Sequence, residues 1–294
     1  MSIMGDKKTG RLLGIWKSVF GFILSEPRIL IPFFILAACE TFLLWVLANS
    51  PHFPFNFVFA PPIRRVWGPI YLHYPYIYEL LPRIFYFMKI VLSIFVGSLT
   101  TGMAIHLILA SDKNEPINLK KTFFFVFKKY LSLMLLAAVL FITVHFVMKQ
   151  PAIVFFKYFK AGHVKLLFLG PKFWFGMFLP ALSFFMAVVL QAIFVYSFPY
   201  VVIKGKKFLV ALVLGVKLFL KNWIKTLVVV ALPMLLYIPV TMLRNNTAVL
   251  ADKFSPEVIV SVLFIGILIG TVVVDALVTI VTTLLFIEAT EHES

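Results

Sequence analysis

Four of the polar side chains within the long apolar segments of this sequence fall near one depth: Glu40, His145, Gln191 and Asp275. Counting about 1.5 Å per residue, Glu40, Gln191 and Asp275 lie roughly 18 Å from one expected membrane surface, and His145 lies slightly deeper. A charged carboxylate at mid-bilayer costs about 2.5 to 3.5 kcal/mol, so these groups should face the bundle interior, form pairs or carry a proton. The functional hypothesis is a midplane polar site for protons, an ion or a substrate headgroup, with Asp275 and Glu40 as its titratable members.

The same residues also permit a structural interpretation. A buried hydrogen-bonded cluster would fix how the helices pack, with His145 or Lys89 as a partner of the acids. Both interpretations stay open, with a preference for function at Asp275 because intramembrane acids usually serve one. Gly266 and Gly270 form a GxxxG pair, which predicts a close helix contact in the last apolar segment.

The elements that carry these residues are expected to be membrane spans. The 294 residues are 62% hydrophobic and 13% charged, with a mean hydropathy of +1.03, whereas soluble domains are about half apolar and a quarter charged. The single cysteine, Cys39, excludes an internal disulfide and a zinc or redox motif. The net charge of +15 is spread over short segments beside apolar runs, so the expected partners are anionic lipid headgroups and not nucleic acid.

The segment from Lys204 to Leu232 organises the chain. Lys217, Lys221 and Lys225 recur every four residues and form one narrow arc of a helix. Such a helix is expected to lie in the membrane interface, with its lysines among the headgroups, before a sharp turn at Trp223 and a span from Ile224 to about Leu243. These three lysines, with Arg64 and Arg65 of the first long connection, are the candidate headgroup-binding residues.

This unit of interfacial helix and following span occurs three times, which divides a single membrane domain into repeats at about residues 11–111, 112–203 and 204–288. The expected fold is all-α, with six transmembrane helices and three amphipathic interfacial helices on the cytoplasmic side, arranged as a threefold repeat of interfacial helix plus helical hairpin. The expected spans cover residues 28–48, 84–110, 130–148, 173–203, 224–243 and 257–287. Sixteen of the 27 Lys and Arg residues lie on the side of both termini, which predicts that the termini are cytoplasmic.

The connection from Asn49 to Pro82 is rich in proline and aromatic residues. Its prolines are expected to prevent a long helix, which favours an extended flap on the outer membrane surface. The alternative is a lid over a lipid or hydrophobic substrate, with Arg64 and Arg65 available for a phosphate. The second outer connection, Lys149 to Lys172, alternates aromatic and basic residues and is also expected to lie on the membrane surface.

Catalytic sequence patterns are absent. The chain has no HExxH, no GxSxG and no phosphate-binding glycine loop. We therefore expect no cofactor, no metal and no catalytic residue. An intramembrane enzyme acting on lipids stays open as an alternative, with His52, His73, Arg64 and Arg65 as candidates, although they show no triad or ligand spacing.

One further pattern carries a resemblance. The segment from Phe198 to Val230 combines a proline-tyrosine and β-branched run, a basic-glycine turn, an amphipathic helix and an aromatic-tipped span. Together with the opening IWKSVFGFILSEPRILIPFFI, it resembles poorly characterised six-helix bacterial inner-membrane proteins related to the membrane domain of glycerophosphodiester phosphodiesterases. The resemblance implies a six-helix bundle in the inner membrane and supplies no catalytic residues, since no phosphodiesterase domain is present here.

The expected function is a non-enzymatic accessory or scaffold role in membrane or envelope processes, with a protein partner or a second copy as its expected contact. The first alternative is a small permease or lipid transporter that uses the midplane polar site. Neutralising Asp275 or Glu40 distinguishes the two, because a transporter loses activity while its folded amount is unchanged.

Overall fold

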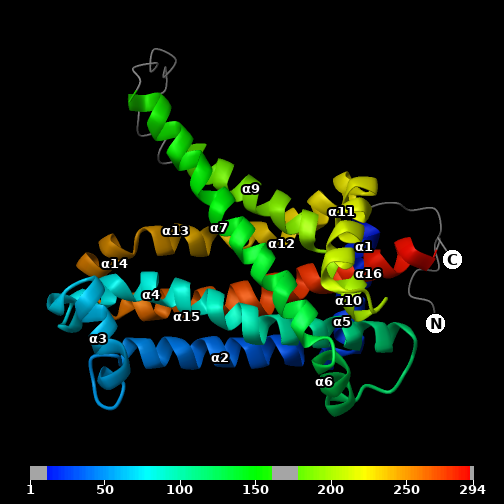
Figure 1. The fold of residues 1–294 in the computed structure, drawn as a ribbon, viewed down its shortest axis with the longest axis horizontal. Coiled ribbons are helices and arrows are strands. Elements are labelled where there is room, and N and C mark those ends of the chain that lie inside the picture. The colour runs from blue at the N-terminus through cyan, green and yellow to red at the C-terminus, as the bar shows by residue number, and fades with distance from the viewer. Residues whose placement is uncertain (1–11, 161–177, 292–294) are drawn as a thin grey trace.

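The computed structural model describes residues 12–160 and 178–291, and every regular element in these two ranges is a helix (Figure 1). The predicted basic tail at residues 1–10 lies outside the described residues. So do the second half of the second connection and the predicted start of the fourth span, whereas residues 149–160 of that connection continue the helix that begins at Tyr130. The all-α fold class is thus confirmed for the described part of the chain.

Five helices are long and apolar enough to cross a membrane, and a sixth span results if one bent pair is counted as a single crossing. The five are Pro27–Ala48, Tyr76–Asp112, Tyr130–Met148, Leu179–Val202 and Val258–Thr290. The bent pair consists of α11 (Phe208–Lys221) and α12 (Trp223–Leu235), which meet at 98°. The chain therefore has the composition and helix lengths of a membrane protein.

Several spans are built from consecutive helical segments with different hydrogen-bond patterns. Two π-helical segments, η3 (Ser93–Gly97) and η6 (Leu268–Asp275), interrupt the second and last spans. The spans are formed by η1 (Pro27–Leu30) and α2 (Ile31–Ala48); α4 (Tyr76–Leu92), η3 and α5 (Ser98–Asp112); α7 (Tyr130–Lys160); α9 (Leu179–Phe194) and α10 (Ser197–Val202); and α15 (Val258–Ile267), η6 and α16 (Ala276–Glu291).

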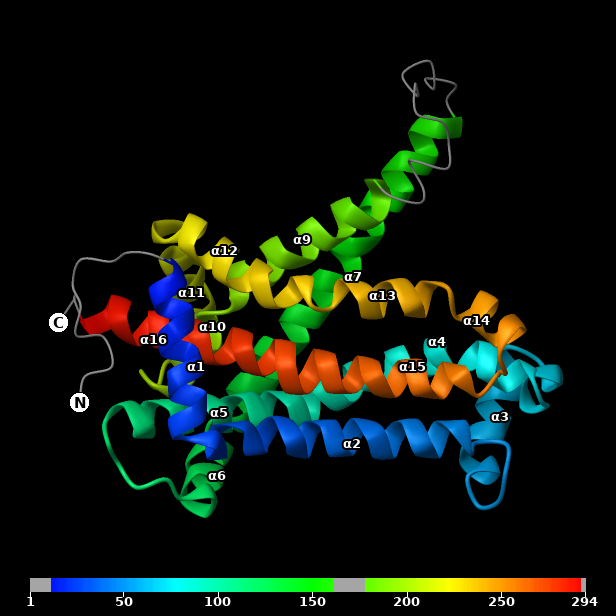
Figure 2. The same cartoon turned by 180° about the vertical axis from the view of Figure 1, so that it is seen from behind.

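Three short helices lie at one end of the bundle, which we call the α1 end. They are α1 (Leu12–Ser25), α6 (Leu119–Phe127) and α11, and each directly precedes a span in the chain. Figures 1 and 2 show them together at the end where the described chain begins and ends. The opposite end holds α3 (Asn56–Val66), η2 (Pro69–Leu72) and α14 (Thr247–Lys253), and we call it the α3 end.

The α1 end is held by contacts between these short helices and the spans. The Lys129 ammonium donates a hydrogen bond of 2.6 Å to the carbonyl of Val202, the last residue of α10, and so binds a helix C-terminus that has no partner within its own helix. A Cβ at Gly215 of α11 would lie 2.8 Å from the backbone nitrogen of Ser197 in α10. Only glycine permits this approach.

The first long connection differs from the expected extended flap. It contains the 11-residue helix α3, with Pro61 and Pro62 inside it. Proline removes a backbone hydrogen bond, and packing of Ile63, which is 2% exposed, against Ile77 and Leu80 offsets this loss. The following span also begins at Tyr76 and not near residue 84, because Pro82 is accommodated inside α4.

The fifth span is not the single helix expected from residue 224 to residue 243. The chain ends α12 at Leu235, turns at residues 236–237, and starts again as α13 (Ile238–Asn245). Pro239 lies in the first turn of α13, where its missing N–H costs no helical hydrogen bond. A proline there would conflict with a continuous helix, since its ring clashes with the carbonyl four residues earlier.

Candidate functional site

A charged cluster joins three spans inside the bundle. The Nζ atom of Lys89 in α4 lies 3.0 Å from Oε2 of Glu40 in α2. The hydroxyl of Thr271 in η6 donates a 2.7 Å hydrogen bond to the same Oε2 atom. Lys89 Nζ also donates a 3.4 Å hydrogen bond to Thr271 Oγ1. The three side chains therefore form a closed triangle of contacts, which we call the Glu40 cluster.

Burial explains why Glu40 needs both partners. Its side chain is 1% exposed, so the carboxylate has lost its water. A buried ion requires an opposite charge and additional hydrogen bonds to offset desolvation. Lys89 supplies the charge and Thr271 supplies the hydrogen bond, so the negative charge of Glu40 is compensated within the bundle.

The cluster coincides with irregular helix geometry. Thr271 lies inside the π-helical segment η6, and Asp275 is its last residue. Lys89 lies one turn before the second π-helical segment, η3. Such segments occur mostly as short interruptions of α-helices and are frequent at functional sites. Two spans thus depart from regular α-helix next to their charged residues.

Asp275 lies one helical turn beyond Thr271 and differs from Glu40 in its surroundings. It interacts electrostatically with Lys89 and with Glu40, yet its side chain is open to the outside of the protein. Asp275 is thus exposed at the surface of its span, beside the cluster. Within residues 12–160 and 178–291 it forms no hydrogen bond and no ion pair. An acid without a partner at this depth is costly and points to a ligand or a proton.

A narrow groove leads to Lys89. Its walls come from α4 and from the chain around α13, and its floor is α15. The groove residues are Pro82, Phe85, Tyr86, Lys89, Tyr237, Val240, Arg244, Val262, Leu263, Gly266 and Ile267. Among these residues Lys89 and Arg244 are cationic, and most of the others are apolar. The Lys89 side chain, which is 28% exposed, therefore borders a largely apolar groove.

The GxxxG pair forms the close contact that its spacing predicts. A Cβ at Gly266 would lie 3.1 Å from Val240, and one at Gly270 would lie 3.1 Å from the ring of Tyr237. Both glycines thus let α13 and the preceding turn approach the last span. Tyr237 lies in the break between α12 and α13, and it interacts electrostatically with Lys89.

The other two candidates for the midplane site lie elsewhere in the bundle. His145 is in α7 and its ring contacts the neighbouring Phe146 at 6.1 Å, while Gln191 is in α9. No hydrogen bond or ion pair in the described ranges connects either residue to Glu40 or Asp275. The structure therefore brings Glu40 and Asp275 together around Lys89 and leaves Gln191 and His145 outside this group.

The candidate headgroup-binding residues are all exposed. Lys217 and Lys221 lie on α11 and Lys225 on α12, on both sides of the 98° bend. Arg64 and Arg65 lie in the last turn of α3 at the opposite end of the molecule. They form two separate basic regions, one at each end of the bundle.

The candidates for an enzyme are only partly gathered. His52, His73 and Arg64 line one pocket at the α3 end, and Arg65 does not. No group of three metal-binding side chains occurs among the described residues.

Comparisons with known proteins add no relative. No family model, curated protein or solved structure matches the chain.

Proposed function

We propose that the chain is a proton-coupled membrane transporter whose site consists of the Glu40 cluster and Asp275. The observation that carries this proposal is Asp275, an acid inside a span that is open to the outside of the bundle and has no partner in the described chain. A cluster that served only to hold helices together would be expected to satisfy all its charges, as it does at Glu40.

Charge counting indicates what the site binds. Two carboxylates, Glu40 and Asp275, share one ammonium, Lys89. With all three groups ionised the site carries one excess negative charge, which is unfavourable at this depth. One bound proton or one cationic ligand makes the site neutral. The site is therefore suited to alternate between a proton and a second ligand.

Lys89 provides the link between the two acids. Its ammonium contacts Glu40 directly and interacts electrostatically with Asp275. When Asp275 is protonated, Lys89 stays with Glu40. When Asp275 loses its proton, it competes for Lys89 and weakens the contact with Glu40, which loosens the joint between α2, α4 and η6. The groove between α4 and α13 borders the same lysine.

The topology in this proposal has six crossings in a bacterial inner membrane, with both termini cytoplasmic. The positions of α1, α6 and α11 at one end, each directly before a span, support a threefold repeat with interfacial helices on that side. The 98° bend between α11 and α12 fits a helix that lies along the membrane surface before its span.

The test is proton flux into vesicles that contain the purified protein, driven by a potassium diffusion potential and followed with an enclosed pH-sensitive dye. We expect flux with the wild type and its loss in Asp275→Asn. The control is Asp252→Asn, which makes the same change at an exposed acid in α14. Thermal unfolding in detergent is measured for all three proteins. Flux that is equal in wild type, Asp275→Asn and protein-free vesicles contradicts the proposal.

A scaffold role is the second candidate, and the complete pairing of Glu40 favours it. One ion pair and one hydrogen bond connect α2, α4 and η6, as a cluster that only fixes helix packing would do. This role predicts that Asp275→Asn lowers the unfolding temperature and changes no flux. The same two measurements therefore separate the candidates.

A further inference from the structure

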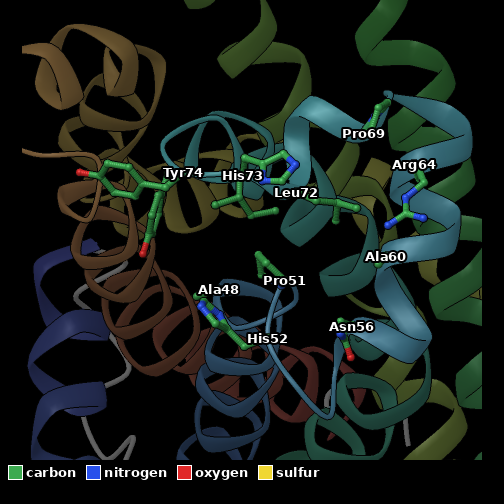
Figure 3. A pocket seen from close by; sticks show the side chains of 12 residues that line it. Ala48, Pro51, His52, Asn56, Ala60, Arg64, Pro69, Leu72, His73 and Tyr74 are labelled. Atoms are coloured by element: carbon green, nitrogen blue, oxygen red, sulfur yellow. The ribbon is translucent and has the colours of Figure 1, made fainter.

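A pocket of about 490 Å³ lies at the α3 end, away from the Glu40 cluster. Its walls come from the end of α2, the following connection, α3 and the start of α4. Figure 3 shows Arg64 and Asn56 on one side and Tyr74 on the opposite side, with His73 and His52 between them. The connection of residues 49–75 thus forms much of the wall of a partly open pocket.

The polar groups of this pocket suit an anion. The lining residues include one guanidinium, two imidazoles, two tyrosines and one amide, and none is a carboxylate. The planar guanidinium of Arg64 matches the oxygen atoms of a phosphate, which it binds through two parallel hydrogen bonds. Glu257, just before α15, interacts electrostatically with Tyr78. The negative group therefore belongs on the Arg64 side of the pocket.

Asn56 indicates a second chemical property of the ligand. Its Oδ1 atom is buried and has no hydrogen-bond partner. A buried acceptor without a donor is unfavourable, by about 1 to 3 kcal/mol, and in a folded protein it usually has a partner. The other pocket groups recognise negative charge, whereas an amide oxygen needs a donor. Because Oδ1 is buried, the Asn56 amide must turn toward the pocket, which Asn56 lines, to accept a hydrogen bond from a ligand hydroxyl. A phosphate ester with a hydroxylated substituent then satisfies both Arg64 and Asn56.

The surroundings of the pocket are apolar. Phe53 and Phe57 are 78% and 72% exposed, and Val58 is exposed beside them. All three belong to the same connection and α3 that form the pocket wall. Aromatic side chains of this kind are stable at the headgroup level of a membrane. A ligand in the pocket would therefore sit where phospholipid headgroups are found.

We propose that this pocket binds a phosphodiester or phosphomonoester with a hydroxylated substituent, through Arg64 and Asn56. A membrane lipid such as phosphatidylglycerol and a soluble glycerol phosphate share this chemistry. The site involves neither Asp275 nor Lys89, so it can be tested independently of proton coupling. In this site Arg64 binds the negatively charged phosphate, and Asn56 accepts a hydrogen bond from the hydroxyl.

The first arm of the test compares two lipids of equal charge by native mass spectrometry of the purified protein. Phosphatidylglycerol carries hydroxyls on its headgroup and phosphatidylmethanol carries none. We expect Arg64→Gln to weaken both lipids at least about tenfold, as expected for a lost charge-assisted hydrogen bond. Asn56→Ala should weaken phosphatidylglycerol alone, because only that lipid donates a hydroxyl.

The matched control is Arg65→Gln, since Arg65 is the next residue in α3, is exposed and lies outside the pocket. It should bind both lipids as the wild type does, which removes a general effect of surface charge. Circular dichroism and the unfolding temperature verify that each variant is folded. Equal binding by wild type and Arg64→Gln, or an equal loss in Arg65→Gln, overturns the proposal.

The second arm identifies the source of the phosphate. Glycerol 3-phosphate is titrated into the same proteins without added lipid. Binding that depends on Arg64 supports a soluble phosphate ester, and lipid binding without it supports a headgroup. If neither ligand binds in an Arg64-dependent manner, the pocket is not a phosphate site.

Discussion

Replacing Lys89 by methionine would test whether Glu40 depends on its partner. The change leaves the Glu40 carboxylate, which is 1% exposed, with the Thr271 hydroxyl as its only hydrogen-bond donor among the described residues. Breaking a buried ion pair from one side costs about 3 to 5 kcal/mol. Lys89 is 28% exposed along the groove, so the lower end applies. We expect the free energy of unfolding to fall by about 3 kcal/mol.

The double variant Glu40→Gln/Lys89→Met makes this prediction quantitative. It removes both charges and keeps an amide that Thr271 can still bind, so we expect a loss of only about 1 kcal/mol. The two positions should therefore show a coupling energy of at least about 2 kcal/mol. Unfolding is followed by tryptophan fluorescence during titration of mixed micelles with a denaturing detergent.

The control for this cycle is Lys225→Met, which removes an exposed lysine from α12. It should change the free energy of unfolding by less than about 0.5 kcal/mol. Additive effects at residues 40 and 89, within about 0.5 kcal/mol, would refute the idea that the pair acts as a unit. So would a Lys89→Met variant that is as stable as Lys225→Met.

Two other predictions concern the α1 end. Gly215→Ala places a Cβ 2.8 Å from the backbone nitrogen of Ser197 and should lower the free energy of unfolding by about 1 to 3 kcal/mol. Gly21→Ala is the control, because a Cβ at Gly21 has open space and should not destabilise the protein. Equal effects of the two changes in the same detergent titration would contradict the packing argument. Burial lowers the pKa of the Lys129 ammonium from its ordinary 10.5. Between the lowered pKa and 10.5 the folded chain then binds fewer protons than the unfolded chain, so stability rises with pH in that window. The unfolding temperature of wild type relative to Lys129→Met should therefore increase as the pH rises toward 10.5, and a flat difference would contradict this reasoning.

Hydropathy predicts the ends of a span well where the apolar run is bounded by charged residues. The first span, expected from about Arg28, starts at Pro27 and ends at Ala48 as expected. The prediction is wrong near two prolines, Pro82 and Pro239. Pro82 is accommodated in α4, whereas the fifth run is broken two residues before Pro239. The effect of a proline depends on tertiary packing around it, which hydropathy does not describe.

The site was only partly predictable for a related reason. Depth along a span follows from counting residues, and this places Glu40 and Asp275 at one level. Gln191 and His145 have similar depths and yet lie apart, because depth does not determine which spans are neighbours or which way a helix face points. Lys89 was expected as one possible partner of the acids. Thr271 carries no sequence signal, since it is one of several hydroxyls in an apolar run.

The π-helical segment η6 also determines where the last span can change length. A π-helical interruption holds one more residue than regular α-helix over the same stretch, and the helices on either side keep their rotational phase. Losing one residue within Leu268–Asp275 would therefore restore regular helix while α15 and α16 keep their packed faces. The same deletion inside α15 would rotate everything before it by about 100° relative to α16. A one-residue length change within η6 would thus remove the geometry around Asp275 and spare the bundle.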